Sequence, residues 1–271
     1  MSENLYKKIE ELYLLGRITK DEKEALLKAL DNKEETTNSI SQIQINVKLC
    51  DLEIVGREDI HYPKFEQGSL KIIRDGNILR LEDGLNFNSV VRILVPFNSN
   101  ILIKSVSSDI SVVSVLGFLQ IQSVSSDVQI SDVSDRIIIS LISGDVETTN
   151  LHGKLNITTK SGDIKINKSK VSAVLKTYSG DIVANDTEFN DSRFNTFNGD
   201  ITLKDALFLN KNSINTYFGD VSIEVIGEVL INASSSMGNV SNKYHASFQE
   251  TSNELSIDTK FGDIEIEGKE T

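Results

Sequence analysis

Four related stretches decide the fold: LISGDVETTN (residues 141–150), TKSGDIKINK (159–168), TYSGDIVAND (177–186) and TFNGDITLKD (196–205). Their shared triplet is either a binding element used many times or a corner that the backbone turns many times. Alignment on the Asp of the triplet finds nine copies, at Asp109, Asp127, Asp145, Asp163, Asp181, Asp200, Asp220, Asn239 and Asp263. The intervals are 18, 18, 18, 18, 19, 20, 19 and 24 residues, and so regular a period is typical of a solenoid.

The residues around each aligned Asp or Asn alternate between apolar and polar. The following residue is always Ile or Val, which suits a crowded strand. The sixth residue before it is always apolar, as in Ile121, and the fourth is Ser or Thr in eight of the nine copies, as in Thr177. Side chains two residues apart share one face of a strand. We therefore expect a buried apolar face with a column of hydroxyls that hydrogen-bond to one another.

The inward face can be kept on both sides of the triplet only if the chain bends there. Gly precedes the aligned residue in seven of the nine copies, and Ser108 and Ser126 precede it in the other two. Gly permits positive φ, and an Asp side chain can accept hydrogen bonds from nearby amides. We interpret the triplet as a corner, formed by Gly144, Asp145, Gly162, Asp163, Gly180, Asp181, Gly199, Asp200, Gly219, Asp220, Gly262 and Asp263.

Coils of this length stack as parallel strands about 4.8 Å apart. The predicted fold is mainly β: a single-stranded, right-handed β-helix (β-solenoid) of about nine 18–20-residue coils, with a short N-terminal α-hairpin. A propeller blade needs about 40 residues and does not fit the period. Because stacked carboxylates repel one another, a cation bound along a ridge of Asp127, Asp145, Asp163 and Asp181 is a second use that we consider for this column.

The chain divides into four zones. Residues 1–32 are predicted to form two short helices, the first ended by Gly16 and the second begun by a capping box of Thr19 and Glu22. Residues 33–41 are a polar linker. Residues 42–104 are a β-rich leading segment, interpreted as antiparallel sheet with a hairpin turn at Asp75-Gly76. Residues 105–271 are the repeat, and we expect 42–271 to form one continuous domain.

Composition bears on partners and location. The 28 Lys and Arg against 40 Asp and Glu give a net charge of −12, so nucleic acid is a poor partner. Cys50 is the single cysteine and has no disulfide partner within the chain. Neither a signal peptide nor an apolar stretch of about 20 residues is visible. We expect a cytoplasmic protein, compatible with peripheral membrane association; a surface location is the alternative.

The sequence holds no familiar catalytic or metal-binding pattern. His61, His152 and His245 lack metal-ligand spacing, and no nucleophile elbow, phosphate loop or dinucleotide fingerprint occurs. Polysaccharide lyases and hydrolases also use right-handed β-helices, but their chemistry needs paired carboxylates in a cleft between long loops. We expect no catalytic residue, metal or cofactor, and a carbohydrate-active enzyme is the least favoured alternative.

The SGD-[IV]-x-[IV] repeat resembles the bacterial "putative adhesin" family of β-strand-repeat domains of unknown function, over about residues 40–267. The stretch KKIEELYLLGRITKDEKEALLKAL (7–30) is similar to the SHOCT-like helical hairpin that accompanies such domains, some of them linked to cell-envelope stress responses. The resemblance implies a β-solenoid with a helical interaction module and no catalytic residues. We expect a non-enzymatic scaffold whose hairpin docks to itself or to a partner protein. The alternative is an adhesin-like cell-surface or envelope-binding module.

Overall fold

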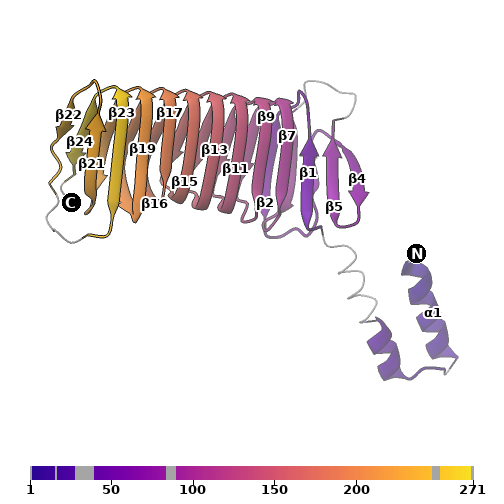
Figure 1. Cartoon of the computed structure of the whole chain (residues 1–271). Helices are drawn as coiled ribbons and strands as arrows, with labels where there is room; N and C mark the ends of the chain where they lie inside the picture. Colours follow the sequence, from indigo (N-terminus) through magenta and orange to yellow (C-terminus); the bar gives the residue numbers. More distant parts are fainter. Residues whose placement is uncertain (1, 16, 28–39, 84–89, 246–250, 270–271) are drawn as a thin grey trace.

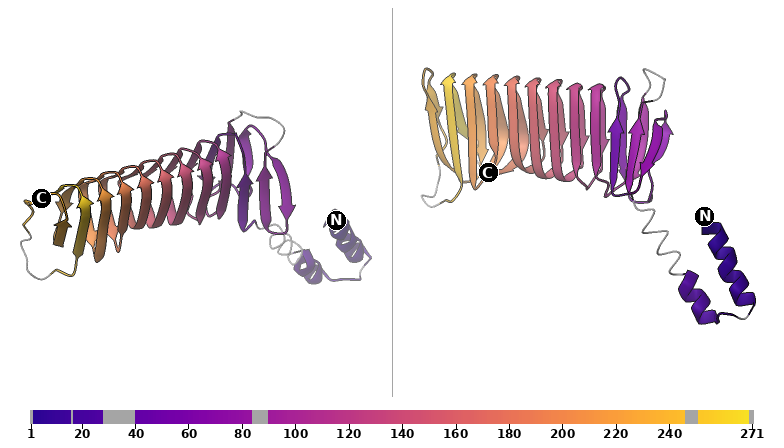
Figure 2. Two further views of the ribbon diagram at one scale, coloured as in Figure 1. Left: turned by 45° about the horizontal axis from the view of Figure 1, so that its top comes forward. Right: turned by 45° about the vertical axis from the view of Figure 1, so that its right-hand side comes forward.

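The computed structural model describes residues 2–15, 17–27, 40–83, 90–245 and 251–269 (Figure 1). Two helical segments come first, α1 (Ser2–Leu14) and residues 20–27. The strands β1 to β24 follow and stack into one long solenoid, in which each coil contributes one strand to each of two series (Figures 1 and 2). The prediction of a mainly β solenoid with N-terminal helices is confirmed.

The first series is parallel throughout, and its strands pair with the equivalent residues one coil away. Ile121 lies between Ile103 and Ile139, each 18 residues distant. In spatial order the strands are β5 (Ile78–Glu82), β1 (Gln42–Asn46), β7 (Ile101–Ser107), β9 (Leu119–Ser125), β11 (Ser134–Ser143), β13 (His152–Ser161), β15 (Lys170–Ser179), β17 (Arg193–Asn198), β19 (Lys211–Phe218), β23 (Glu254–Phe261) and β21 (Leu230–Ser235).

The second series begins just after each corner and follows the same order. Its strands are β6 (Val91–Pro96), β2 (Leu52–Arg57), β8 (Ile110–Val113), β10 (Val128–Ser131), β12 (Val146–Thr149), β14 (Ile164–Asn167), β16 (Ile182–Asn190), β18 (Ile201–Leu209), β20 (Val221–Ile226), β24 (Ile264–Gly268) and β22 (Val240–Asn242). Two antiparallel strands complete the N-terminal end: β3 (Lys64–Gln67) on β6, and β4 (Lys71–Asp75) on β5.

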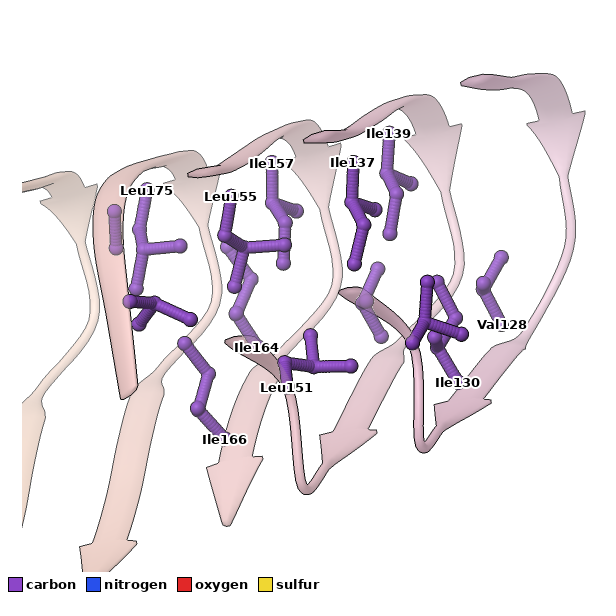
Figure 3. Close-up of a cluster of buried hydrophobic side chains, with 14 of the residues drawn as sticks. Val128, Ile130, Ile137, Ile139, Leu151, Leu155, Ile157, Ile164, Ile166 and Leu175 are labelled. Atoms are coloured by element: carbon purple, nitrogen blue, oxygen red, sulfur yellow. The ribbon is translucent and has the colours of Figure 1, made fainter. Parts of the chain in front are cut away.

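The core lies between the two series and runs through the whole solenoid. Ile, Val and Leu side chains of successive coils point inward and stack in columns, as Figure 3 shows for Ile139, Ile157 and Ile164. Three phenylalanines, Phe189, Phe194 and Phe208, fill the interior of the later coils. In strands such as β10 and β14, the first and third residues are buried and the second is exposed. This alternation with a period of two residues is what the sequence predicts.

The leading segment corrects the sequence-based interpretation. Its strands β1, β2, β5 and β6 are parallel coils of the same solenoid, so the described chain winds through eleven coils rather than about nine. Only β3 and β4 pair antiparallel. The hairpin predicted at Asp75-Gly76 is confirmed, because Asp75 pairs with Ile78 and Gly76 has φ +61°. Sequence alone missed the first coil because its corner, Leu49-Cys50-Asp51, lacks the Gly.

Both ends of the solenoid depart from sequential stacking. The coil β1/β2 lies between β5/β6 and β7/β8, and the coil β23/β24 lies between β19/β20 and β21/β22. At the C-terminal end the inserted coil is the better core former: Leu255 and Ile257 are fully buried, whereas Ile231 and Ala233 are half-buried. A coil with a complete apolar face gains from a neighbour on each side, and a weaker one suits the end.

The N-terminal helices form the predicted hairpin. Thr19 N–H donates to Glu22 Oε2 at 2.8 Å and Glu22 N–H donates to Thr19 Oγ1 at 3.3 Å, which confirms the capping box. Lys23 Nζ lies 2.7 Å from Glu10 Oε2 and 4.6 Å from the centroid of the Tyr13 ring, so it joins the two helices. Gly16 and, apart from residues 40 and 41, the predicted linker lie outside the described residues.

Candidate interaction surface

The aspartates of the repeat form one column, held by a hydrogen bond that repeats from coil to coil. At every corner from Asp109 to Asp263 except Asp127, the amide N–H of the corner residue donates to Oδ1 of the aspartate in the neighbouring coil, at 2.8 Å from Asp163 to Asp145 and from Asp181 to Asp163. The column begins at Asp51, which accepts from Asp109 at 3.1 Å, and ends at Asn239, which donates to Asp263 at 2.7 Å. The triplet is therefore a corner, and the Asp side chain is part of its backbone scaffold.

The corner glycines leave room for the carbonyl of the neighbouring coil. A Cβ on Gly162 (φ +147°) would lie 2.1 Å from the Gly144 carbonyl oxygen. The inward hydroxyls contact these same carbonyls: Thr177 Oγ1 donates to Gly162 O at 3.3 Å, and Ser235 Oγ donates to Gly262 O at 2.8 Å. The predicted bonding of the hydroxyls to one another is therefore wrong, because the carbonyl of the next coil lies within reach instead.

The oxygens of the Asp column bear on the cation ridge considered from the sequence. Among the residues that the structure describes, no group of three or more His, Cys, Asp or Glu is arranged to hold a metal ion. This includes Asp127, Asp145, Asp163 and Asp181, whose Oδ1 atoms accept backbone N–H groups. Each of these stacked carboxylates therefore has a backbone amide as a hydrogen-bond partner. Their geometry gives no support to the hypothesis of a cation bound along the ridge.

Cys50 and the three histidines are dispersed. Cys50 is buried at the first corner, with its Sγ 3.4 Å from Asp83 Oδ1. Burial first, then the hydrogen bond and the charge of Asp83, raise the pKa of this thiol to about 12. His61, His152 and His245 are exposed at separate places along the chain, so none of them forms a site with Cys50.

The outer side of the corner carries a feature that sequence reasoning did not identify. The third residue before each corner Asp points outward, and in most coils it is a large apolar residue. We call the resulting row, with two rings beside it, the apolar stripe: Val106, Val124, Ile142, Tyr178, Phe197, Tyr217, Phe218 and Phe261. Exposure of Val106, Val124, Ile142, Tyr178, Phe197 and Phe218 is between 38% and 60%. Lys160 occupies the equivalent position between Ile142 and Tyr178.

The rings of the stripe stack along the solenoid. Phe197 lies between Tyr178 and Tyr217, with centroid distances of 4.8 and 4.9 Å and interplanar angles of 4° and 13°. Phe218 stacks on Phe261 at 5.0 Å. Lys260 Nζ lies 4.7 Å from the centroid of the Tyr217 ring and donates to its hydroxyl at 3.0 Å. These spacings match the distance between neighbouring strands, so both faces of Phe197 are covered by its neighbours.

Opposite charges flank the apolar stripe. On one side lies the exposed Asp column. On the other lies the outer face of the first series, where strands β7 to β19 carry one acidic residue, Asp135, and seven basic ones outside the stripe row: Lys104, Arg136, Lys154, Lys170, Lys176, Arg193 and Lys211; β23, at the end of the stripe, carries Glu254 and Asp258. Lys176 stands two residues before Tyr178, and Asp181 stands three after it, so the charge order acid–apolar–basic runs across a single coil.

No curated protein matches this chain. A solved structure, "Crystal structure of a putative cell adhesion protein from Clostridium sporogenes ATCC 15579 at 1.95 A resolution", aligns over 86% of this chain and 95% of its own, with 15% identity and a TM-score of 0.22. Neither helical segment in the described residues has the length and apolar character needed to cross a membrane.

The family model described as "Toastrack DUF4097" matches residues 40–267. That range begins just before β1 and ends within β24, so it covers the entire solenoid and leaves out the helical hairpin. The match therefore agrees with the repeat that the corner column and the stacked coils define. The chain belongs to the Toastrack DUF4097 family.

Proposed function

We propose that this protein is a non-enzymatic scaffold: a rigid β-solenoid with an N-terminal SHOCT-like hairpin that docks to a partner protein or to another copy. The observation that carries the proposal is the exposure of leucines on the hairpin. Leu14 and Leu15 are 78% and 70% exposed, and Leu26 is 43% exposed. Apolar side chains grouped on a short helical pair are typical of a docking surface.

The outer surface of the solenoid supports a scaffold more than an enzyme. The open hollow over β11, β13 and β15 is lined by one carboxylate, Asp135, together with Arg136 and Lys154. Hydrolysis of a glycosidic bond uses a pair of carboxylates, and a single one beside two cations does not supply it. A second hollow, over β2, β8 and β10, does group carboxylates, but Oδ1 of Asp51 and of Asp127 there accepts a corner amide and so has a structural role. The repeated coils instead offer a long surface of fixed spacing, which suits binding.

An adhesin-like surface or envelope-binding module is the second candidate. It is favoured by the length of the exposed apolar stripe, because large apolar patches mark interaction surfaces. The resemblance noted from the sequence also suggests a role in cell-envelope stress responses, with the protein in the cytoplasm or at the membrane surface. Protease accessibility in intact cells separates the two candidates, since a surface module is cleaved and a cytoplasmic scaffold is protected.

The docking role of the hairpin is tested by substitution in the full chain. Leu14→Ser combined with Leu15→Ser removes exposed apolar surface, and Lys8→Ser combined with Glu11→Ser is the matched control on the same helix. We expect the leucine variant to lose its partners in affinity capture from native cells, or to lose mass in light scattering if the partner is another copy. Unchanged partners and unchanged mass would show that the hairpin does not dock.

A further inference from the structure

The apolar stripe runs along the solenoid for eight of its coils, from Val106 in β7 to Phe261 in β23. Eight coils at about 4.8 Å give a stripe roughly 40 Å long. With the charged columns on each side it is about 15 Å wide, so two such surfaces in contact would bury about 1,200 Å² in total. This area reaches the lower limit of specific protein–protein interfaces.

The geometry of the rings limits what can bind here. Phe197 has a neighbour stacked on each face, at interplanar angles of 4° and 13°. A sugar stacks on the open face of an aromatic ring, and both faces of Phe197 are occupied within the protein, which leaves Tyr178, at the end of the stack, as a single platform. The ring edges and the aliphatic side chains of Val106, Val124 and Ile142 remain exposed. The stripe therefore suits another long apolar surface with the same spacing.

The charges beside the stripe determine how a second copy would be oriented. Two surfaces related by a two-fold axis parallel to the solenoid place the acidic side of one copy against the basic side of the other. An axis perpendicular to the solenoid would place acidic side against acidic side. The Asp column lies on one side of the stripe and Lys104 and Lys176 lie on the other, so only the parallel arrangement brings opposite charges together.

We propose that the solenoid pairs with a second copy of this chain along the apolar stripe, side by side and in parallel. Apolar stripe residues of one copy then meet their own equivalents in the other, and Lys104 and Lys176 face the Asp column of the partner copy. Lys160, in the same row, meets its own equivalent, and this like-charge contact is a cost that the apolar contacts on both sides of it must offset. Parallel pairing also brings both helical hairpins to the same end of the dimer. The inference rests on the proposed scaffold function and specifies one partner of the solenoid.

The test uses single cysteines in the full chain with Cys50→Ala. Val106→Cys and Phe218→Cys lie near opposite ends of the stripe, and Ser222→Cys lies exposed on the second series as the control. Under mild oxidation we expect Val106→Cys and Phe218→Cys each to form a disulfide-linked dimer, and Ser222→Cys to stay monomeric. A mixture of the two stripe variants should give no mixed dimer, because parallel pairing keeps these positions six coils apart.

Two further results would overturn the proposal. A mixed Val106–Phe218 dimer without the two homodimers shows antiparallel pairing. A chain that is dimeric by light scattering but does not cross-link at the stripe shows that the hairpin, not the solenoid, carries self-association, and leaves the proposed function intact. A monomeric chain that binds phosphatidylcholine vesicles, and loses this binding in the variant below, shows a lipid surface as the occupant instead.

A second variant addresses the same surface without cross-linking. Ile142→Lys combined with Tyr178→Lys places two charges on the stripe at exposed positions. We expect the dissociation constant of the dimer to rise at least tenfold while the circular dichroism spectrum and melting temperature stay close to those of the parent. Gln129→Lys with Ser222→Lys, at exposed positions on the second series, adds the same two charges away from the stripe and is the control. An unchanged dissociation constant in the stripe variant contradicts the proposal.

Discussion

The amide N–H of Asp163 donates a 2.8 Å hydrogen bond to Oδ1 of Asp145, the corner residue of the neighbouring coil. At a corner the backbone leaves the strand ladder, so the amide there needs a partner from outside it. The carboxylate of the neighbouring coil supplies that partner, and the repeat of 18 residues places it at the same height in each coil. The need of the corner amide for a hydrogen-bond acceptor is thus enough to explain the Asp of the triplet.

Removing this acceptor should destabilise the solenoid. We expect Asp145→Ala to lower the free energy of unfolding by about 1–2 kcal/mol, because the Asp163 amide loses its partner. Asp145→Asn keeps an oxygen in place and reduces repulsion along the column, so its effect should stay within about 0.5 kcal/mol. Urea denaturation measures both. Equal losses in the two variants would show that the charge, and not the acceptor, is what matters.

The corner glycine should be even less replaceable. We expect Gly162→Ala to lower the free energy of unfolding by roughly 2–4 kcal/mol, because the added Cβ would lie 2.1 Å from the Gly144 carbonyl oxygen. Gly76→Ala is the control: its φ is +61° but no atom lies within 4 Å of the added Cβ. It should lose only about 1 kcal/mol, from the backbone conformation. Similar losses would mean that φ, and not the carbonyl, requires glycine.

The corner column could be predicted because every coil repeats the same residues at the same spacing. Ile110, Val128 and Ile164 are buried directly after it, as the alternation indicates. A second corner was missed. It lies five residues after six of the corner aspartates, from Asp109 to Asp200, where φ is between +48° and +57° at Ser114, Asp132, Asn150, Lys168, Asp186 and Asp205. Asp and Asn tolerate this conformation, so their recurrence was the signal available in the sequence.

The order of the end coils could not be predicted from the repeat. Any coil with the right spacing can pair with any other. Which coil lies outermost depends on how much apolar surface each one buries when it has a neighbour on both sides. The apolar stripe shows a related limit. Alternation indicates that Tyr178 and Phe197 point outward, but their stacking at 4.8 Å and their 60% and 38% exposure depend on the neighbouring coils.

Lys168 is the least suitable residue at the second corner. Its φ is +48°, a region that costs an ordinary side chain about 1–2 kcal/mol and that Asn adopts more readily. We expect Lys168→Asn to raise the free energy of unfolding by about 0.5–1 kcal/mol. Lys154→Asn, at an exposed strand position, removes the same charge without this gain. Urea denaturation of the two variants side by side measures the difference, and a gain in both would point to charge instead.

The corners of the coils β7/β8 and β9/β10, where Ser replaces Gly, differ in their hydrogen bonding. Ser126 Oγ lies 2.6 Å from Ser123 Oγ and accepts from the Ser108 amide at 3.3 Å. In the described residues, the buried hydroxyls of Ser105 and Ser108 have no partner. A buried hydroxyl without a partner costs about 1–3 kcal/mol. The coil β7/β8 carries this cost at Ser108, whereas the equivalent hydroxyl of Ser126 in the coil β9/β10 is hydrogen-bonded.

Alanine at these two positions should therefore have opposite effects. We expect Ser108→Ala to raise the free energy of unfolding by about 1 kcal/mol, since it removes the unpaired hydroxyl. Ser126→Ala should lower it by about 1–2 kcal/mol, since Ser123 and the Ser108 amide lose their partner. Thermal unfolding followed by circular dichroism separates the two. A loss of stability in both variants would show that the Ser108 hydroxyl does find a partner in solution.

Cys50 should be inert in the folded protein. Burial and the neighbouring Asp83 raise the pKa of its thiol to about 12, well above that of an ordinary thiol, so the thiolate that reacts with disulfide reagents is scarce near pH 8. We expect an aromatic disulfide reagent to label Cys50 only after the chain is unfolded in urea, and to label the exposed Ser222→Cys at once.

The raised pKa of Cys50 also contributes stability that is fully present below pH 9. This contribution is lost as pH rises from about 9 towards 12, because the thiol of the unfolded chain loses its proton first. Cys50→Ala should therefore show a shallower loss of unfolding free energy over that range. Rapid labelling of the native chain at pH 8 would mean that the first corner opens, which the burial of Cys50 between β1 and β2 argues against.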